Sequence, residues 1–348
     1  MDIRDKEVTP PIPTPSEQRL AALLGEAQAA PDPNRWLQRL VSEGLDRLPL
    51  PGGGATLARW RALAQVAACD LGLVKLFEAH EDALAIHAEL GSTEIPRHSR
   101  WGVWCAQAPG HDLMVSTGTS ADRVSLDGSK AWCSGAATLT HTLVSARTAD
   151  NRSWLVAVAL DQPGITVTDR GWAAVGMRSA ASVDVLFSHA EGRLVGAPGG
   201  YVERPGFLHG AAGVAACWYG ATASIVDFTR SALAGKADPH RLAHLGAMDV
   251  ALSQARAMLI AAAKAIDASP TDGCALEVAR ARLAVEGAAE EILVRASRAL
   301  GAAPLCRDAG FARLMADLPV FIRQSHAERD QAAHGQRVAT LEEPQWTL

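Results

Sequence analysis

Clustered cysteines, an excess of positive charge and long apolar runs are all missing from this sequence. Six cysteines are scattered over 348 residues, with neither a C-x-x-C pair nor a Cys/His pair at the spacing of a metal site. We therefore expect no metal, and reduced, mostly buried thiols in a cytoplasmic protein. The six are Cys69, Cys105, Cys133, Cys217, Cys274 and Cys306.

The charge balance is slightly acidic, with a net charge of −5 and an isoelectric point near 6.1. No basic stripe is available to hold nucleic acid phosphates, so we expect no nucleic acid partner. The chain has no signal-peptide pattern at its start and no uncharged apolar run of the roughly 20 residues that cross a bilayer. We expect no membrane partner and a cytoplasmic location.

What is present is an ordinary globular composition, 48% hydrophobic and 20% charged, which supports a sizeable core. Residues 1–15 hold several prolines and charges and are predicted to be a loose arm. Residues 16–99 show helical periodicity, with helices expected at 56–68 and 71–90. This is the predicted N-terminal helical domain.

Residues 100–204 change to period two and β-branched residues, which predicts a β-domain. Buried strands are expected at 154–160 and 182–187, and Asp127-Gly128 predicts a tight hairpin turn.

Residues 205–340 return to helical periodicity, with long Ala-rich helices expected at 210–234, 239–268, 274–300 and 311–335. Four such helices predict a C-terminal bundle, and Pro319 is expected in the first turn of the last helix or at a kink. The small residues Ala211, Ala212, Ala215 and Ala216 suggest a helix face that packs against a second copy, giving a homodimer or homotetramer.

One stretch carries the strongest functional signal, the run from Lys130 through Trp132, Cys133 and Ser134 to Ala136. A large aromatic, then a hydroxyl and a bare backbone, suits a flat ligand that the main chain approaches closely. The alternative interpretation is an ordinary hairpin with a buried Trp.

The same stretch resembles the "L-x-G-x-K-x-W-I-T-N-G" segment of the acyl-CoA dehydrogenase superfamily of flavoproteins. Residues 171–178, which end Gly176-Met177-Arg178, resemble its "L-G-M-R" segment. The resemblance implies a mainly α fold with a central β-domain, in which N-terminal helices precede a small β-barrel or sandwich and a C-terminal four-helix bundle.

In proteins similar to this one, FAD lies between the β-domain and the C-terminal helices. The resemblance places Trp132 against the ring and the Ser134 hydroxyl near flavin N5, and makes Cys133 between them a cofactor-binding residue. It aligns an earlier flavin strand with residues 104–112, where Gln107 keeps an amide that can both donate to and accept from the flavin. The cofactor residues expected on this basis also include Trp104, Ala106, Gly110, His111 and, from a reduced "Q-x-x-G-G-x-G" segment, Arg298.

The activity implied first is α,β-dehydrogenation of an acyl-CoA or acyl-like thioester, with hydride transfer to flavin N5. That reaction needs a base for the α-proton. The resemblance puts Ser325 where the family has its glutamate, and serine cannot be that base. The neighbouring His326, Glu328 one turn on, and His209 near the family's alternative position are the candidates.

Two other functions remain open. The family's "R-x-x-F-G" segment, which binds the FAD pyrophosphate, has no counterpart near Lys236. FMN or an exchangeable reduced flavin could therefore replace FAD. The first of the two other functions is a protein that binds a ligand without turnover. Residues 133–136 and 172–178 look even more like the flavin monooxygenases of this fold, which oxidise small aromatic or sulfur compounds. In those enzymes a hydroxyl and a last-helix His stabilise the C4a-hydroperoxide, roles open to Ser134 and His326. Expected partners are a small-molecule substrate and an electron-transfer protein or flavin reductase.

Overall fold

The computed structural model describes residues 14–91, 95–117, 122–235, 238–343 and 346. The predicted arm at 1–15 lies outside this range except for its last two residues. Of those, Thr14 caps the first helix through a capping box with Glu17.

The N-terminal unit consists of four helices, α1 (Pro15–Ala29), α2 (Pro33–Ser42), α3 (Thr56–Cys69) and α4 (Leu71–Leu90). The helices predicted at 56–68 and 71–90 are confirmed. Asp70 caps α4 by accepting the Leu73 N–H, and Gly91 ends it in the left-handed conformation. Trp60, Leu63 and Phe77 from α3 and α4 are almost completely buried in the core.

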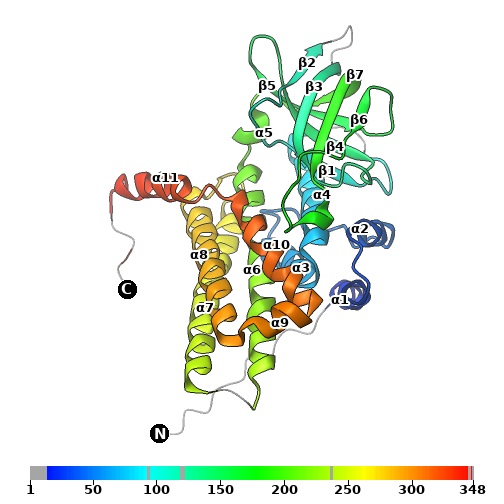
Figure 1. The fold of residues 1–348 in the computed structure, drawn as a ribbon. Coiled ribbons are helices and arrows are strands. Elements are labelled where there is room, and N and C mark those ends of the chain that lie inside the picture. The colour runs from blue at the N-terminus through cyan, green and yellow to red at the C-terminus, as the bar shows by residue number, and fades with distance from the viewer. Residues whose placement is uncertain (1–13, 92–94, 118–121, 236–237, 344–345, 347–348) are drawn as a thin grey trace.

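The β-domain contains a closed barrel. Its elements are β1 (Trp101–Trp104), β2 (Leu113–Thr117), β3 (Arg123–Cys133), β4 (His141–Arg147), β5 (Ser153–Ala159), β6 (Ile165–Val167), the 3₁₀ turn η1 (Arg178–Ala180) and β7 (Val183–Val195). The pairings β4–β2–β3–β7–β5–β4 close a ring, to which β1 adds along β4 and β6 along β7. Figure 1 shows this domain at one end of the molecule, above the helices.

The predicted hairpin turn at Asp127-Gly128 is wrong. Both residues lie inside the continuous strand β3, which pairs with β2 on one side and β7 on the other. Gly128, at φ 127°, absorbs a register shift in the β3–β7 pairing, and an added Cβ would collide with the Asp112 carbonyl. The glycine is therefore required by a bulge and a close backbone approach.

The C-terminal unit begins after the short helix α5 (Gly200–Glu203). It contains α6 (Pro205–Leu233), α7 (Pro239–Ala268), α8 (Ala275–Leu300), α9 (Ala302–Arg307), α10 (Ala309–Phe321), the 3₁₀ turn η2 (Ile322–Gln324) and α11 (Glu328–Ala339). The helices α6, α7 and α8 pack against one another, and α10 packs on α6. The predicted helical bundle is confirmed, although α6 starts five residues earlier than expected, with Pro205 in its first turn.

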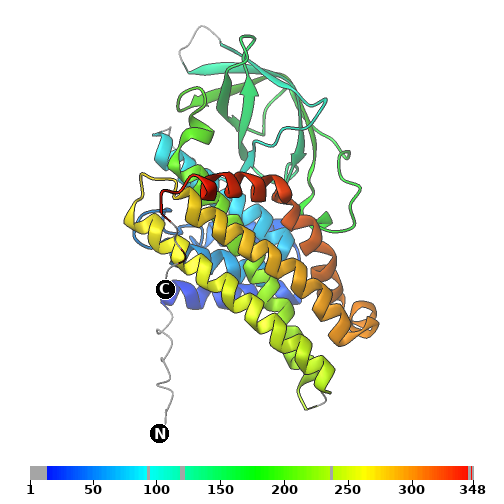
Figure 2. The same cartoon turned by 90° about the vertical axis from the view of Figure 1, so that its left-hand side faces the viewer.

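The single helix predicted at 311–335 is wrong, because the chain breaks there. Pro319 lies inside α10, near its end, and Ser325, His326 and Ala327 separate η2 from α11. Ala327 takes a positive φ of 43°, which redirects the chain. In Figures 1 and 2, α11 lies at the level of the junction between the β-domain and the helices.

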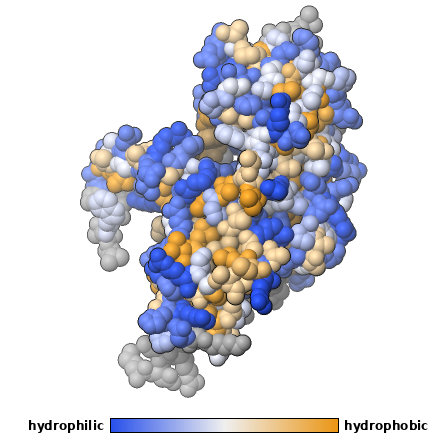
Figure 3. All heavy atoms as spheres, in the orientation of Figure 1, coloured by the Kyte–Doolittle hydropathy of each residue, from blue (hydrophilic) through white to orange (hydrophobic). Residues whose placement is uncertain are grey.

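The small residues expected at a subunit interface are used inside the chain instead. Ala212, Ala215 and Ala216 are 0–2% exposed, on a helix that packs against α3 and α8. Large apolar side chains are exposed elsewhere in the C-terminal unit, and Figure 3 shows hydrophobic residues gathered over its helices. Those on α7 and α8 are Leu242, Val250, Met258 and Val294.

Within the described residues, α7 alone is long and apolar enough to cross a membrane. One such helix is weak evidence for membrane insertion, since core helices of soluble proteins often have the same length and composition.

Candidate functional site

A cavity of about 590 Å³ opens where the β-domain meets the helices, walled by α4, the end of β1, α5 and α6, α8, and the chain from Gln324 through α11. Its lining is rich in charge. The titratable side chains on it are Lys75, Glu78, Asp82, Cys105, Tyr201, Arg204, Arg282, Glu286, His326, Asp330 and Arg337.

On the α4 side the charges are paired. Lys75 Nζ lies 3.6 Å from Glu78, and Arg204 lies 3.5 Å from Asp82 and 2.8 Å from Glu89. Burial raises the pKa of both Glu78 and Asp82, against the opposing effect of Lys75 and Arg204 respectively. This wall therefore holds two carboxyls that are easier to protonate than usual.

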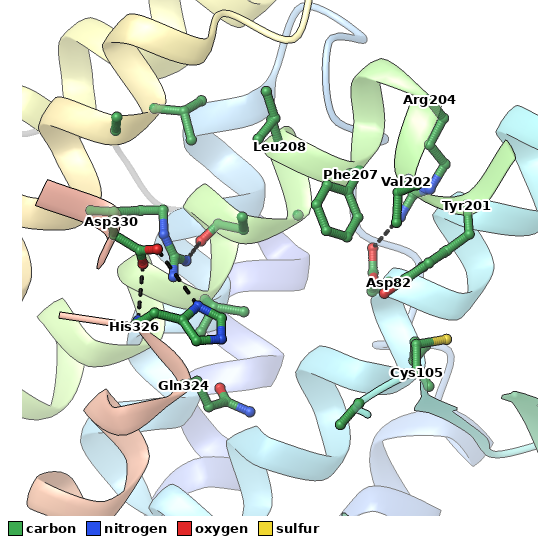
Figure 4. Close-up of a pocket in the computed structure, with 18 of the residues that line it drawn as sticks. Asp82, Cys105, Tyr201, Val202, Arg204, Phe207, Leu208, Gln324, His326 and Asp330 are labelled. Atoms are coloured by element: carbon green, nitrogen blue, oxygen red, sulfur yellow. Dashed lines mark hydrogen bonds and ion pairs between the residues drawn. The ribbon is translucent and has the colours of Figure 1, made fainter. Parts of the chain in front are cut away.

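On the opposite side, His326 and Asp330 form a pair at the cavity wall (Figure 4). Asp330 accepts the His326 backbone N–H at 3.0 Å, and its other oxygen lies 3.6 Å from Nδ1 of the ring. A carboxylate facing Nδ1 favours the tautomer with the proton on that nitrogen.

Ser325, beside this pair, points into the protein. Its hydroxyl donates to Oε1 of Glu286 at 2.5 Å, and Arg323 donates to the same oxygen at 3.0 Å. Glu286 is only 5% exposed, it lines the cavity, and its second oxygen has no hydrogen-bond partner among the described residues. A buried carboxylate from α8 thus lies behind Ser325, the residue that the resemblance aligned with the family's glutamate.

The other two base candidates are not at the cavity. His209 is 2% exposed, and its Nε2 lies 2.9 Å from the Asp272 carbonyl, so it serves to join α6 to the turn before α8. Glu328 is exposed in the first turn of α11 and does not line the cavity.

The strand residues expected at the cofactor begin at the end of β1. Gln107 and Ala106 are exposed and line the cavity, whereas Trp104 is buried. Gln107 also lines a second cavity of about 380 Å³ on the β-domain, which contains Gly110's neighbours Pro109 and His111. Lys130 fixes this strand end by donating to the Ala106 carbonyl at 2.9 Å.

The other residues expected at the cofactor, Trp132, Cys133 and Ser134, lie at and after the end of β3, and a hydrogen bond connects them to β1. Trp104 Nε1 donates to the Ser134 carbonyl at 3.2 Å, and the Ser134 hydroxyl lies 2.7 Å from that of Ser182. Trp132 has φ 58° and is 47% exposed, so the alternative interpretation, an ordinary hairpin with a buried Trp, is wrong. Cys133 is fully buried, and burial raises the pKa of its thiol far above the ordinary value.

The remaining predicted residues are dispersed. Gly110 is exposed with φ 79°, and His111 Nδ1 lies 3.2 Å from the Ser129 hydroxyl. Arg298 is exposed in the last turn of α8, roughly 18 Å along the helix axis from Glu286. A single chain therefore does not bring Arg298 to this cavity.

The side chains at the β-domain suit a flavin ring. Trp132 offers a half-exposed aromatic face and Gln107 an exposed amide that donates and accepts, whereas Ser134 is 7% exposed and its hydroxyl lies against that of Ser182. This set of groups fits a flat heterocycle with polar edges.

Reasoning from the sequence missed the charged side chains that α4, α8 and α11 supply. Arg282 and Glu286 are four residues apart on α8, as are Glu78 and Asp82 on α4, so each pair shares a helix face. Spacing of this kind marks a common face but does not say that the face lines a cavity.

Two family models match this chain. The family model described as acyl-CoA dehydrogenase, middle domain, matches residues 107–190, and that described as acyl-CoA dehydrogenase, C-terminal domain, matches residues 199–322. The chain belongs to the acyl-CoA dehydrogenase superfamily. No curated protein sequence matches it.

Solved structures of the same fold cover almost the whole chain. KijD3 in complex with FMN and a dTDP-amino-keto-sugar is 21% identical with a TM-score of 0.80, over 96% of both chains. TdsC from Paenibacillus sp. A11-2 with FMN and indole is 19% identical with a TM-score of 0.82, over 94% of this chain and 98% of that one. Methanesulfinate monooxygenase MsuC from Pseudomonas fluorescens is 17% identical with a TM-score of 0.79, over 96% and 98%.

Proposed function

We propose that this member of the superfamily is a flavin-dependent oxidoreductase that uses reduced flavin and oxygen to oxidise a small polar substrate. Structures of the same fold support the cofactor and the class, since KijD3 and TdsC are described with FMN and MsuC is named a monooxygenase. In this chain Trp132, Ser134 and Gln107 would hold the flavin, FMN or FAD, which supplies the activation of oxygen when bound.

The observation that carries the proposal is the His326–Asp330 pair on the cavity wall. Ser325, at the position of the family's base, is held away by Glu286, and Glu328 lies outside the cavity. The last helices therefore bring two groups to the cavity that can move a proton, the His326 imidazole and the Asp330 carboxylate that faces it. His326 would donate a proton at its Nε2 and hold polar groups of the bound molecules.

The lining of the cavity combines charged and apolar side chains. Charged groups lie on the α4, α8 and α11 walls, and Phe207, Leu208 and Val278 add an apolar surface. A small substrate with both a polar and an apolar part would match this lining.

Acyl dehydrogenation stays as the second candidate because of Glu286. Its buried carboxylate lines the cavity beside Ser325, and its second oxygen has no partner within the described part of the chain. A rotation of this side chain would give the cavity a base of the type that α-proton abstraction needs.

One experiment separates the candidates. The purified protein is first loaded with FMN or FAD. In one assay a panel of acyl-CoA compounds is added without oxygen. In the other, a reductase, NADH and oxygen are added with a panel of small polar compounds. We expect no flavin bleaching by acyl-CoA, and a product that gains one oxygen atom by mass spectrometry. Bleaching by an acyl-CoA would favour dehydrogenation, and failure to bind either flavin would favour a protein that binds a ligand without turnover.

A further inference from the structure

We propose that Arg282 anchors the molecule bound in the cavity by its oxyanion group, a carboxylate, sulfinate or phosphate. That this molecule is the substrate rests on the proposed function, whereas the anion site itself does not.

Arg282 lies in the first third of α8 and lines the cavity. One of its nitrogens, Nη1, donates to the Ala211 carbonyl of α6, and its guanidinium lies over the Trp218 ring at 4.9 Å from the centroid. A guanidinium has five N–H donors, and no other described residue accepts one of them. The group is fixed in place with most of its hydrogen-bonding capacity unused.

Three carboxylates influence Arg282 from a distance, and each is engaged elsewhere. Glu78 of α4 pairs with Lys75, Glu286 of α8 holds Ser325 and Arg323 through its Oε1 alone, and Asp330 of α11 holds His326.

Glu286 is four residues after Arg282, the spacing that favours a helical ion pair, yet the two form none. Arg282 therefore has no counter-ion in direct contact among the described residues.

Burial makes this arrangement costly without a ligand. The pKa of Arg282 is lowered by burial, which means that its charge is poorly compensated by its surroundings. A ligand oxyanion would restore the missing contact through two parallel N–H···O bonds, the geometry in which guanidinium groups are strongest.

The side chains around Arg282 also indicate the chemistry of the rest of the ligand. Phe207 and Leu208 of α6 and Val278 of α8 give the same cavity an apolar wall, and Figure 4 shows Phe207 and Leu208 on the helix that faces Asp330. An anionic group on a small apolar or aromatic body matches both features.

The oxyanion could come from the substrate or from the phosphate of FMN. We assign it to the substrate because Arg282 comes from α8, while the groups suited to the flavin ring come from the β-domain at Gln107 and Trp132. FMN and riboflavin distinguish the two sources, since they differ only in the phosphate.

The test is binding of benzoate and of its neutral analogue benzamide to the flavin-free full-length protein, measured by calorimetry at low ionic strength. The wild type is compared with Arg282→Gln, Arg282→Lys and the control Arg295→Gln. Arg295 is on the same helix but pairs with Glu291 and does not line the cavity.

We expect the wild type and Arg295→Gln to bind benzoate about tenfold more tightly than benzamide, and Arg282→Gln to lose this preference. Arg282→Lys should keep part of the preference for benzoate, because lysine retains the positive charge but cannot make two parallel hydrogen bonds to one oxyanion. The ratio of FMN to riboflavin affinity should be the same in all four proteins.

Equal affinity of the wild type for benzoate and benzamide, or a preference retained by Arg282→Gln, would overturn the anion site. A loss of FMN but not riboflavin affinity in Arg282→Gln would overturn its assignment to the substrate. Circular dichroism checks folding, and if Arg282→Gln does not fold, the wild-type preference and Arg282→Lys decide the question. No turnover is involved, so failure here and failure of the proposed function are separate results.

Discussion

Ser325 donates its hydroxyl hydrogen to Glu286 Oε1 at 2.5 Å, which ties the break after α10 to the middle of α8. The same carboxylate accepts from Arg323 in η2, so one buried side chain holds both η2 and the first residue of the break. The position of His326, the residue that follows, depends on these two bonds.

We predict that Glu286→Ala destabilises the protein by about 1–3 kcal/mol, because it leaves Ser325 without its partner in a buried position. Glu290→Ala is the matched control. Glu290 also contacts Arg323, at 2.7 Å, but its side chain is 55% exposed, so the loss should be below about 1 kcal/mol. Urea denaturation of the three proteins measures this, and equal losses in both variants would show that Glu286 does not hold the break.

We predict that Trp132→Ala weakens flavin binding at least tenfold, since it removes the aromatic face that the ring would contact. Because Trp132 is 47% exposed, the unfolding free energy of the flavin-free protein should change by only about 1 kcal/mol. Fluorescence titration with FMN and FAD measures the affinity. Trp346→Ala, which alters a tryptophan that is 72% exposed, is the control and should bind flavin normally. Unchanged flavin affinity in folded Trp132→Ala would rule out this end of β3 as the flavin site.

We predict a pH dependence of stability from His87. Burial, aided by His141, lowers its pKa to about 4, so the folded state keeps the ring neutral where the unfolded chain is protonated. The unfolded state then binds more protons between pH 6.5 and 4, and stability falls as the pH falls through this window, by up to about 3 kcal/mol.

His87→Phe, which keeps a ring against Trp101, should flatten the decline in unfolding free energy between pH 7 and pH 5. His240→Gln, at an exposed position on α7, should leave the slope unchanged. The same slope in His87→Phe as in the wild type would assign the pH dependence to other groups.

We predict a homodimer or homotetramer that assembles through α7 and α8. Val250 is 55% exposed on α7, and a lysine there would place a charge in the interface. Sedimentation at micromolar concentration should show the wild type as an oligomer and Val250→Lys shifted toward monomer. Leu50→Lys, at an apolar residue 48% exposed before α3, should sediment like the wild type, and a monomeric wild type would contradict the prediction.

Much of the fold was predictable from periodicity, as the bounds of α3, α4 and α7 show, because long amphipathic helices repeat one signal over many residues. The hairpin turn predicted at Asp127-Gly128 was wrong because an Asp-Gly pair occurs both in tight turns and in β-bulges. Only the pairing of β3 with both β2 and β7 shows that this one is a bulge.

The candidate site was harder to predict because its chain break has no local signal. Ser325, His326 and Ala327 include neither glycine nor proline, and the break is held by contacts from α8. Glu286 and Arg282 likewise read as ordinary positions of a charged helix until the fold turns them toward a cavity.

The most direct test of the central claim is the release of hydrogen peroxide when reduced FMN and oxygen are mixed with the protein. His326 is the imidazole on the cavity wall, whereas Glu328 is a nearby carboxylate outside it. We expect His326→Ala to release peroxide several-fold faster than the wild type, and Glu328→Gln to match the wild type. Equal release by the wild type and His326→Ala would contradict the assignment of His326, and with it the proposed reaction with oxygen.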